Sequence, residues 1–111
     1  MMENNFESTV EQKDGWSVLS LKGRIDGVNA SLAESAAMDA LNGGKKLAIN
    51  MEELKYISSA GLRVFLRVEQ SATGEGKKFV FCGMRGSVKD ILRESGMAML
   101  FESYDTQDDL P

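Results

Sequence analysis

The sequence predicts an α/β domain in which a small mixed sheet, made of an N-terminal hairpin and further parallel strands, is covered by about four helices. A Lys13-Asp14-Gly15 turn joins two strand-like segments, a pattern typical of an antiparallel hairpin. A helical pattern then lies between two apolar strands, which predicts a right-handed crossover and parallel pairing. With 111 residues, no linker and no internal repeat, residues 1–111 are expected to form one domain with a core at about residues 6–102.

The composition narrows the classes of function. A net charge of −4 and a pI of about 4.8 argue against nucleic-acid partners and against anionic membrane surfaces. The N-terminus does not resemble a signal peptide, and no run approaches the ~18 apolar residues of a membrane span. The chain has no histidine, which argues against Ser-His-Asp and Cys-His catalysis and most zinc sites. Lys, Asp and Glu remain possible catalytic groups, so this absence argues only against the commonest enzyme mechanisms. We expect a cytoplasmic protein that is not an enzyme and holds no metal or cofactor, in which the single Cys82 packs as a small hydrophobe.

The first half of the chain is expected to form two strands, a loop and a helix. These strands and the loop are placed at residues 6–12, 16–21 and 23–27. Asn29 or Ser31 can cap the helix that follows, and Ser31 with Glu34 fits a capping box. Helical spacing assigns its inner face to Leu32, Ala36, Ala40 and Leu41.

The middle of the chain is expected to carry a short buried strand at residues 47–49 and a connector at residues 52–56. Ile57 faces inward and anchors a turn, and a helix covers about residues 60–72. The buried stripe of this helix is Gly61, Phe65, Val68 and Ala72, and its solvent side is Arg63, Arg67 and Gln70. Leu62 and Leu66 either pack on the sheet or lie partly exposed in a partner interface.

The last part of the chain is expected to form a buried strand, a helix and a short closing helix. The strand covers residues 79–82, and Ser87 caps the next helix, with Gly96 as its stop. Its inner face is Val88, Ile91 and Leu92. Residues 97–101 should pack back on the body, whereas the acidic residues 103–111 are expected to form a frayed tail.

Two adjacent hydroxyls, Ser58 and Ser59, occupy the turn before the middle helix. A serine at this position can cap the unpaired N–H groups of the first helical turn. The position also suits a phosphate, because the positive end of a helix tolerates an anion and phosphorylation adds about −1.5 to −2 charges. The spacing favours the capping role and leaves open a second role, in which phosphorylation of the serine acts as a switch. Without a histidine to activate it, Ser59 is a poor nucleophile but an acceptable kinase substrate.

Three segments of the chain resemble the STAS domain, the fold of bacterial anti-sigma factor antagonists. YISSAGLRVFL at residues 56–66 resembles the family signature, and LKGRIDGVNA at residues 21–30 resembles the segment that leads into the first helix of the family. GMRGSVKDILRESGMAMLFE at residues 83–102 resembles the closing helix and tail. The resemblance covers about residues 18–102 in the order of the family, and implies a single STAS-like domain.

The resemblance also implies a switching mechanism. The unmodified protein would bind an anti-sigma factor that is also a serine kinase and holds the ATP, so that a sigma factor is released. Phosphorylation would end this binding, and a phosphatase would restore it. By position the phosphate acceptor is Ser59, with Ser58 as the alternative because family members often have Asp where this chain has Ser58.

The family's GR-[IL]-D segment matches Arg24 and Asp26, with Asn29 close by, and this loop should lie near the serine turn. Capping remains the alternative role for Asp26 and Asn29, and solvation for Arg24. The full set expected to bind the partner is Arg24, Asp26, Asn29, Ser58, Ala60, Gly61, Leu62 and Arg63.

Two other functions remain open on the sequence. The chain could be a STAS module of an ABC transporter or stress-signalling assembly without a phosphorylation cycle. It could also be a small-molecule sensor or enzyme, which would require a deep pocket beside Ser59. In each case we expect a monomer or weak dimer without direct membrane insertion.

Overall fold

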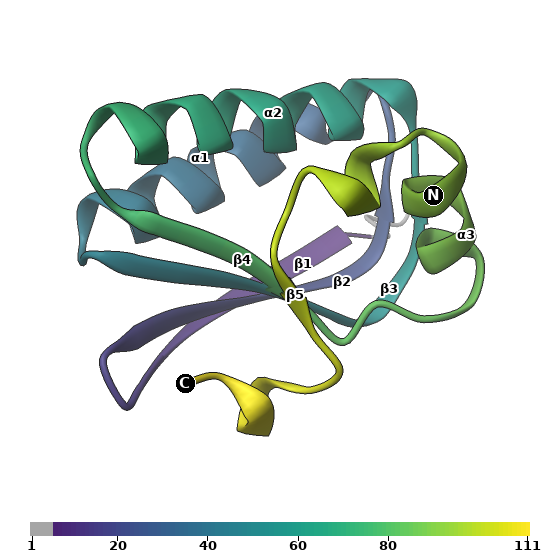
Figure 1. Ribbon diagram of the computed structural model, residues 1–111. Helices are drawn as coiled ribbons and strands as arrows, with labels where there is room; N and C mark the ends of the chain where they lie inside the picture. The colour runs from purple at the N-terminus through teal and green to yellow at the C-terminus, as the bar shows by residue number, and fades with distance from the viewer. Residues whose placement is uncertain (1–5) are drawn as a thin grey trace.

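The computed structural model describes residues 6–111 and shows a five-stranded sheet with two helices side by side across one face (Figure 1). The strands, in sheet order, are β1 (Phe6–Lys13), β2 (Trp16–Ile25), β3 (Lys46–Ile57), β4 (Lys78–Cys82) and β5 (Ser103–Tyr104). β1 and β2 pair antiparallel, and the remaining neighbours pair parallel. The helical segments are α1 (Ala30–Asn42), α2 (Ser59–Gly74), α3 (Gly86–Glu94) and the 3₁₀ turns η1 (Met97–Met99) and η2 (Gln107–Asp109). This architecture confirms the predicted α/β class. The described residues form three α-helices, not about four, because the expected closing helix is only the single 3₁₀ turn η1.

The first face of the sheet is buried beneath α1 and α2. Leu19, Leu21, Ile49 and Phe81 on this face are at most 1% exposed. The Phe65 ring of α2 lies 5.1 Å from the Phe81 ring, centroid to centroid. Each such side chain contributes about 1.5–3 kcal/mol by leaving water, so this face supplies most of the core.

The second face carries an apolar cluster that the end of the chain covers. The cluster consists of Trp16, Val18, Ala48, Val80 and Cys82, and Tyr104 and Leu110 pack against it. The burial of Cys82 confirms that this thiol packs as a small hydrophobe. The prediction of a frayed tail was wrong: residues 103–111 form β5 and η2, and the Trp16 indole N–H donates to the Pro111 carbonyl at 2.9 Å.

Strands β2 and β3 both extend beyond their predicted ends. β2 continues through part of the expected glycine loop to Ile25, and β3 continues through the expected connector to Ile57. Their parallel pairing persists to Ile25 opposite Ile57, with two register shifts that act as bulges. Leu54 is buried in this extension while Glu53 beside it is exposed, so the segment is a strand with one solvated face.

The inner face of α1 differs from the predicted one. The helix begins at Ala30, and its buried residues are Ala30, Ala33, Ala37, Ala40 and Leu41. Leu32 is 54% exposed, so its predicted place in the core was wrong. The predicted capping box is also absent, because Ser31 lies inside the helix and Glu34 instead pairs with Arg67 of α2.

The faces of α2 and α3 follow the prediction more closely. Gly61, Phe65, Val68 and Ala72 are buried, and so are Val88 and Leu92 of α3. Ser87 does not cap α3 as predicted, since its hydroxyl donates to the Lys55 carbonyl at 2.8 Å and Arg85 is the N-cap residue. Across residues 6–111, the structure shows no helix with the length and apolar character that a membrane crossing requires.

The close contact between α2 and the sheet depends on Gly61. A Cβ atom at this position would lie 2.6 Å from Ile57 Cγ1 and 2.8 Å from Ile25 Cγ2, which is closer than real Cβ contacts. The two isoleucines are themselves buried, so neither side chain can swing into solvent to make room. Gly61 therefore sets the distance between the start of α2 and the ends of β2 and β3.

We predict that Gly61→Ala lowers the free energy of unfolding by about 1–3 kcal/mol, the usual cost of overpacking. Gly74→Ala is the matched control, because Gly74 lies on the same helix and nothing is within 4 Å of a Cβ there. Urea unfolding followed by circular dichroism measures both, and Gly74→Ala should be neutral or slightly stabilising. Equal stability of the two variants would contradict the role given to Gly61.

Candidate functional site

The serine turn and the loop after β2 lie at the same end of the sheet, as predicted. Ile25 and Ile57 are paired as neighbours, and the Ser58 backbone N–H donates to the Ile25 carbonyl at 2.8 Å. This places residues 26–29 beside Ser58 and Ser59, where two parallel strands end and α1 and α2 begin. Ligands and partners of α/β proteins commonly bind at this kind of edge.

The two serines have different structural positions. Ser58 is half-buried and is the N-cap residue of α2, and its hydroxyl oxygen accepts from the Gly61 N–H at 3.4 Å. Ser59 is the first residue of the helix and is exposed. Since Ser58 already supplies the cap, the Ser59 hydroxyl is not required for this role.

The loop before α1 is held by its own side chains. Asn29 is only 8% exposed. Its side-chain oxygen accepts a hydrogen bond from the Asp26 N–H at 2.9 Å, and its side-chain NH₂ donates to the Arg24 carbonyl at 2.8 Å. One Asp26 carboxylate oxygen accepts from the N–H groups of Val28 and Asn29 at 3.0 and 3.2 Å. Asn29 is the N-cap residue, yet its side chain makes no capping bond to α1. Asp26 and Asn29 therefore fix the loop next to the serine turn.

Arg24 lies on the outer surface of the sheet at this end. Its guanidinium carbon lies 4.4 Å from the centre of the Tyr56 ring on the neighbouring strand. Such cation–π contacts contribute about 0.5–1 kcal/mol at exposed sites. The contact holds an exposed positive charge near the serine turn, and Tyr56 was not among the predicted site residues.

The remaining predicted partner-binding residues divide by exposure. Arg63 is exposed, and Ala60 and Leu62 are half-buried. Gly61 is buried against Ile25 and Ile57, and Asn29 is buried in the loop, so neither presents a side-chain surface to a partner. Both residues position the site and do not form part of its surface in this conformation.

Sequence reasoning missed two exposed apolar side chains beside the loop. Val28 is 90% exposed and Leu32, one helical turn later, is 54% exposed. Val28 stands between Gly27 and Asn29 in an otherwise polar loop, and this isolated apolar residue was a signal in the sequence. Exposed apolar side chains that lie close together are typical of interaction surfaces.

The two helices that begin at the site are fixed relative to each other by an ion pair. Arg67 of α2 donates twice to the Glu34 carboxylate of α1, at 2.7 and 2.8 Å. The hydrogen bond from Arg67 holds the pKa of Glu34 below its usual range. Because both groups are largely at the surface, the pair contributes orientation more than stability.

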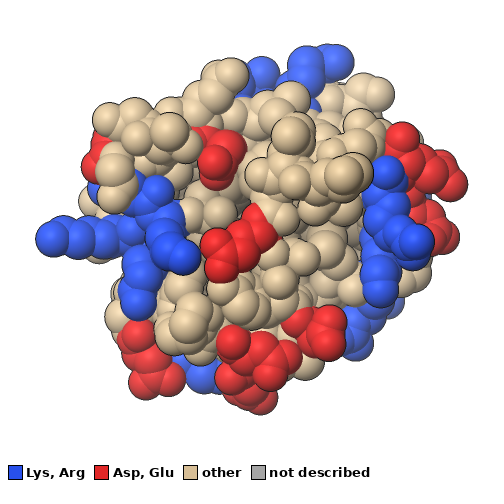
Figure 2. Space-filling model, viewed as in Figure 1, with Lys and Arg blue, Asp and Glu red and all other residues tan. Residues whose placement is uncertain are grey.

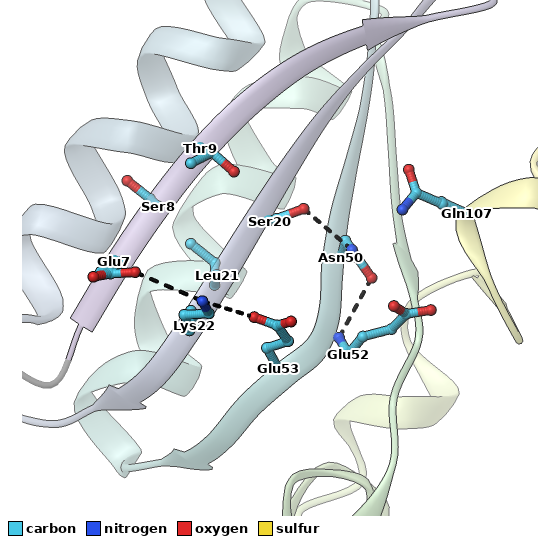
Figure 3. A pocket seen from close by; sticks show the side chains of 10 residues that line it. All are labelled: Glu7, Ser8, Thr9, Ser20, Leu21, Lys22, Asn50, Glu52, Glu53 and Gln107. Carbon is cyan, nitrogen blue, oxygen red and sulfur yellow. Dashed lines mark hydrogen bonds and ion pairs between the residues drawn. The ribbon is translucent and has the colours of Figure 1, made fainter.

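A groove lies on the second face of the sheet, and Ser59 is not among the residues that line it (Figure 3). It has a volume of about 310 Å³ and is lined mainly by β1, β2 and β3, with Gln107 of η2 at one side. Its floor is Asn50, whose amide donates to the Ser20 hydroxyl at 3.1 Å, and its single lysine, Lys22, lies between two glutamates. The hypothesis of a small-molecule sensor or enzyme requires a deep pocket beside Ser59, and this groove is not such a pocket.

The charged side chains near the site form neither a metal centre nor one basic patch. Within residues 6–111, no three metal-binding side chains come together to hold an ion. On the face shown in Figure 2, Lys and Arg are spread around the periphery, with acidic and uncharged surface between them. The arrangement offers a rigid, exposed hydroxyl on a protein surface.

Comparisons with known proteins agree with this geometry. The model of the STAS domain family matches residues 7–110. A Bordetella bronchiseptica protein assigned as the anti-sigma factor antagonist BtrV is 30% identical over 94 residues, which cover 84% of this chain and 81% of the relative. An anti-sigma factor antagonist from Mycobacterium paratuberculosis has a TM-score of 0.84 at 27% identity, covering 94% of this chain and 89% of that one.

The Bacillus protein SpoIIAA shares the fold in two solved forms. Its unphosphorylated form has a TM-score of 0.75 at 16% identity, and covers 93% of this chain and 91% of that one. Its phosphorylated form has a TM-score of 0.68 at 15% identity, and covers 93% of this chain and 95% of that one. At these identities the likeness concerns the fold alone.

We predict that Ser58→Ala and Ser59→Ala differ in stability. Ser58→Ala should lower the free energy of unfolding by about 0.5–1 kcal/mol, at the weak end for a lost N-cap because the bond to Gly61 is long. Ser59→Ala should stay within about 0.5 kcal/mol of the wild type, as for other exposed positions. Urea unfolding measures both variants, and a larger loss for Ser59→Ala would contradict the assignment of the cap.

Proposed function

This chain belongs to the STAS domain family, and from that premise we propose that it is a cytoplasmic anti-sigma factor antagonist controlled by phosphorylation of Ser59. In its unmodified form it binds an anti-sigma factor that is also a serine kinase, and so releases a sigma factor. The kinase holds the ATP, and a separate phosphatase restores the unmodified form. The observation that carries the proposal is the exposed Ser59 hydroxyl at the first position of α2, next to a serine that already caps the helix.

Ser59 meets the structural demands on a kinase substrate better than Ser58. A kinase must reach the hydroxyl and hold it in line with the transferred phosphoryl group. Ser59 is exposed on a helix that packs firmly on the sheet, and its neighbours Ala60 and Gly61 are small. Ser58 is half-buried, and its modification would remove the N-cap bond.

A phosphate on Ser59 would change the surface without unfolding the domain. It adds about −1.5 to −2 charges at the positive end of α2, where an anion is tolerated. The same charge is unfavourable in a dehydrated contact, and opposite an acidic group of the partner it costs several kcal/mol. The modification therefore acts on the interface, while the fold stays intact.

The surface around Ser59 suits a mixed polar and apolar partner. Arg24 and Arg63 supply exposed positive charge, and Val28 and Leu32 supply exposed apolar area on the neighbouring loop and helix. An acidic, partly apolar patch on the anti-sigma factor would complement the unmodified surface. The same acidic patch would repel phosphorylated Ser59.

We predict that a candidate anti-sigma kinase with ATP adds a phosphate to the wild type and to Ser58→Ala, but not to Ser59→Ala. Intact-protein mass spectrometry detects the modification, and calorimetry measures binding to the kinase. The phosphorylated protein should bind at least tenfold more weakly, which corresponds to about 1.4 kcal/mol. Ser59→Ala should bind like the unmodified wild type and remain bound after ATP is added.

The two serine variants act as controls for each other. Phosphorylation that persists in Ser59→Ala would contradict the assignment of Ser59 and show that another residue is the phosphate acceptor. If no cognate kinase binds the wild type or modifies it, the proposal fails, and a STAS module without a phosphorylation cycle becomes the better account.

A further inference from the structure

Residues 103–111, called the strap below, cover the apolar cluster on the second face of the sheet. Figure 1 shows the strap, in yellow, on the side of the sheet opposite α1 and α2. Tyr104 and Leu110 of the strap pack on the cluster. The residues beneath, Trp16, Val18, Ala48, Val80 and Cys82, are at most 1% exposed.

Few contacts join the strap to the body. β5 is two residues long and pairs with β4 at Phe81–Ser103 and Cys82–Tyr104, and the Gly83 N–H donates to the Tyr104 carbonyl at 3.1 Å. The Trp16 indole N–H donates to the Pro111 carbonyl, and Lys13 pairs with Asp108 at 2.6 Å across an exposed surface. Exposed ion pairs of this kind contribute little.

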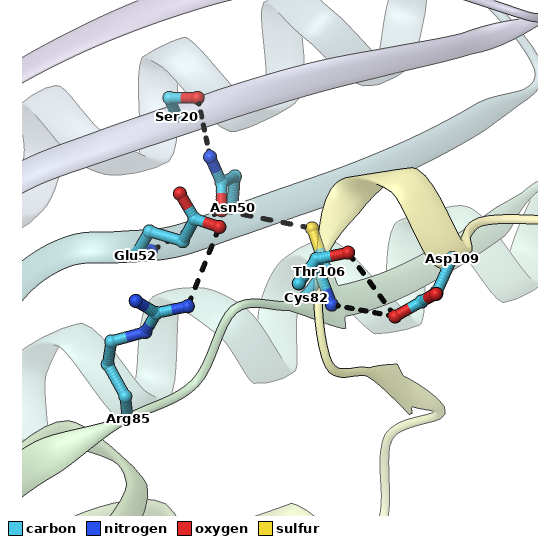
Figure 4. Close-up of polar contacts among 7 residues, drawn as sticks. All are labelled: Ser20, Asn50, Glu52, Cys82, Arg85, Thr106 and Asp109. Atoms are coloured by element: carbon cyan, nitrogen blue, oxygen red, sulfur yellow. Dashed lines mark hydrogen bonds and ion pairs between the residues drawn. The ribbon is translucent and has the colours of Figure 1, made fainter.

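The strap holds its local shape by itself. Thr106 and Asp109 form a reciprocal capping box around η2, and both residues belong to the strap (Figure 4). Figure 4 also shows that the polar contacts of Asn50, Glu52 and Arg85 join strands and loops of the body. Detachment of the strap as a unit therefore breaks neither the capping box within it nor these polar contacts within the body.

The apolar cluster is more deeply buried than the strap that covers it. The cluster lies on the three central strands and is fully apolar, whereas the strap carries three aspartates and only half-buried anchors at Tyr104 and Leu110. Segments with few buried apolar contacts open at lower free energy than the core. We propose that the strap is a detachable cover: it opens as a unit while β1–β4 and α1–α3 stay folded, and thereby uncovers the apolar cluster.

The cluster contains two unique reporters of this opening. Cys82 is the only cysteine and Trp16 the only tryptophan of the chain. Burial raises the pKa of the Cys82 thiol to about 11, so the closed form holds little reactive thiolate. In the open form the thiol faces water next to the vacated position of Tyr104, its partner in the β4–β5 pairing.

The test follows the reaction of Cys82 with a disulfide reagent in the intact chain from zero to moderate urea. With strap opening, the rate should depend only weakly on urea, because a local opening exposes little surface, and should rise steeply only near the unfolding transition. Leu110→Ala should raise the rate in native buffer roughly fivefold, since part of the burial of a leucine is lost. Acrylamide quenching of Trp16 should increase in parallel.

Met99→Ala is the matched control, because Met99 is 91% exposed on η1 and does not pack on the cluster. It should leave the Cys82 rate unchanged. The proposal is overturned if the rate follows the full urea dependence of global unfolding from zero denaturant, as measured by circular dichroism. It is also overturned if Leu110→Ala reacts no faster than the wild type. Neither outcome depends on whether Ser59 is phosphorylated.

Discussion

The contact of Gly61 with Ile25 and Ile57 is the constraint on which the site depends. The three residues come from α2, β2 and β3, and they meet where both strands end. Only a residue without a side chain allows the helix to approach this closely. A larger residue would move the first turn of α2 outward, and the serine turn would move with it.

This close approach also explains why two adjacent serines can have different roles. The backbone N–H of Ser58 is bonded to the end of β2, which turns its hydroxyl toward the helix N–H groups. The next residue then enters the helix on its outer side and is exposed. Serine is also a neutral cap, whereas aspartate would place a negative charge beside Ser59. A phosphate on Ser59 therefore meets less repulsion here than it would beside aspartate.

Most elements, and the meeting of the serine turn with the loop after β2, could be predicted from the sequence because they depend on local patterns and on parallel strand pairing. The hairpin, the parallel crossover, the stripe of α2 and the serine turn all follow from spacing and turn residues. The extension of β3 was missed because its polar residues lie on a solvated face, and Leu32 was misplaced because α1 presents a row of alanines to the sheet.

Features that depend on distant contacts could not be predicted in this way. The order of residues 103–111 depends on Trp16, which is 95 positions from Pro111. The acidic composition of this segment is typical of a frayed terminus, and local patterns contain no information about its partner. The packing role of Gly61 likewise requires Ile25, from a strand much earlier in the chain, although Ile57 alone was recognised as an anchor of the turn.

The two faces of the sheet separate the proposed docking surface from the strap. Ser59 belongs to a helix on the first face, whereas the strap covers the second face and pairs with β4 at the far edge from β1. The contact of Gly61 uses the ends of β2 and β3 and no strap residue. Energetic effects at sites without shared partners usually add. Detachment of the strap should therefore leave the presentation of Ser59 unchanged, and coupling between the two would require a movement of β3, the strand that contributes Ile57 to one face and Ala48 to the other.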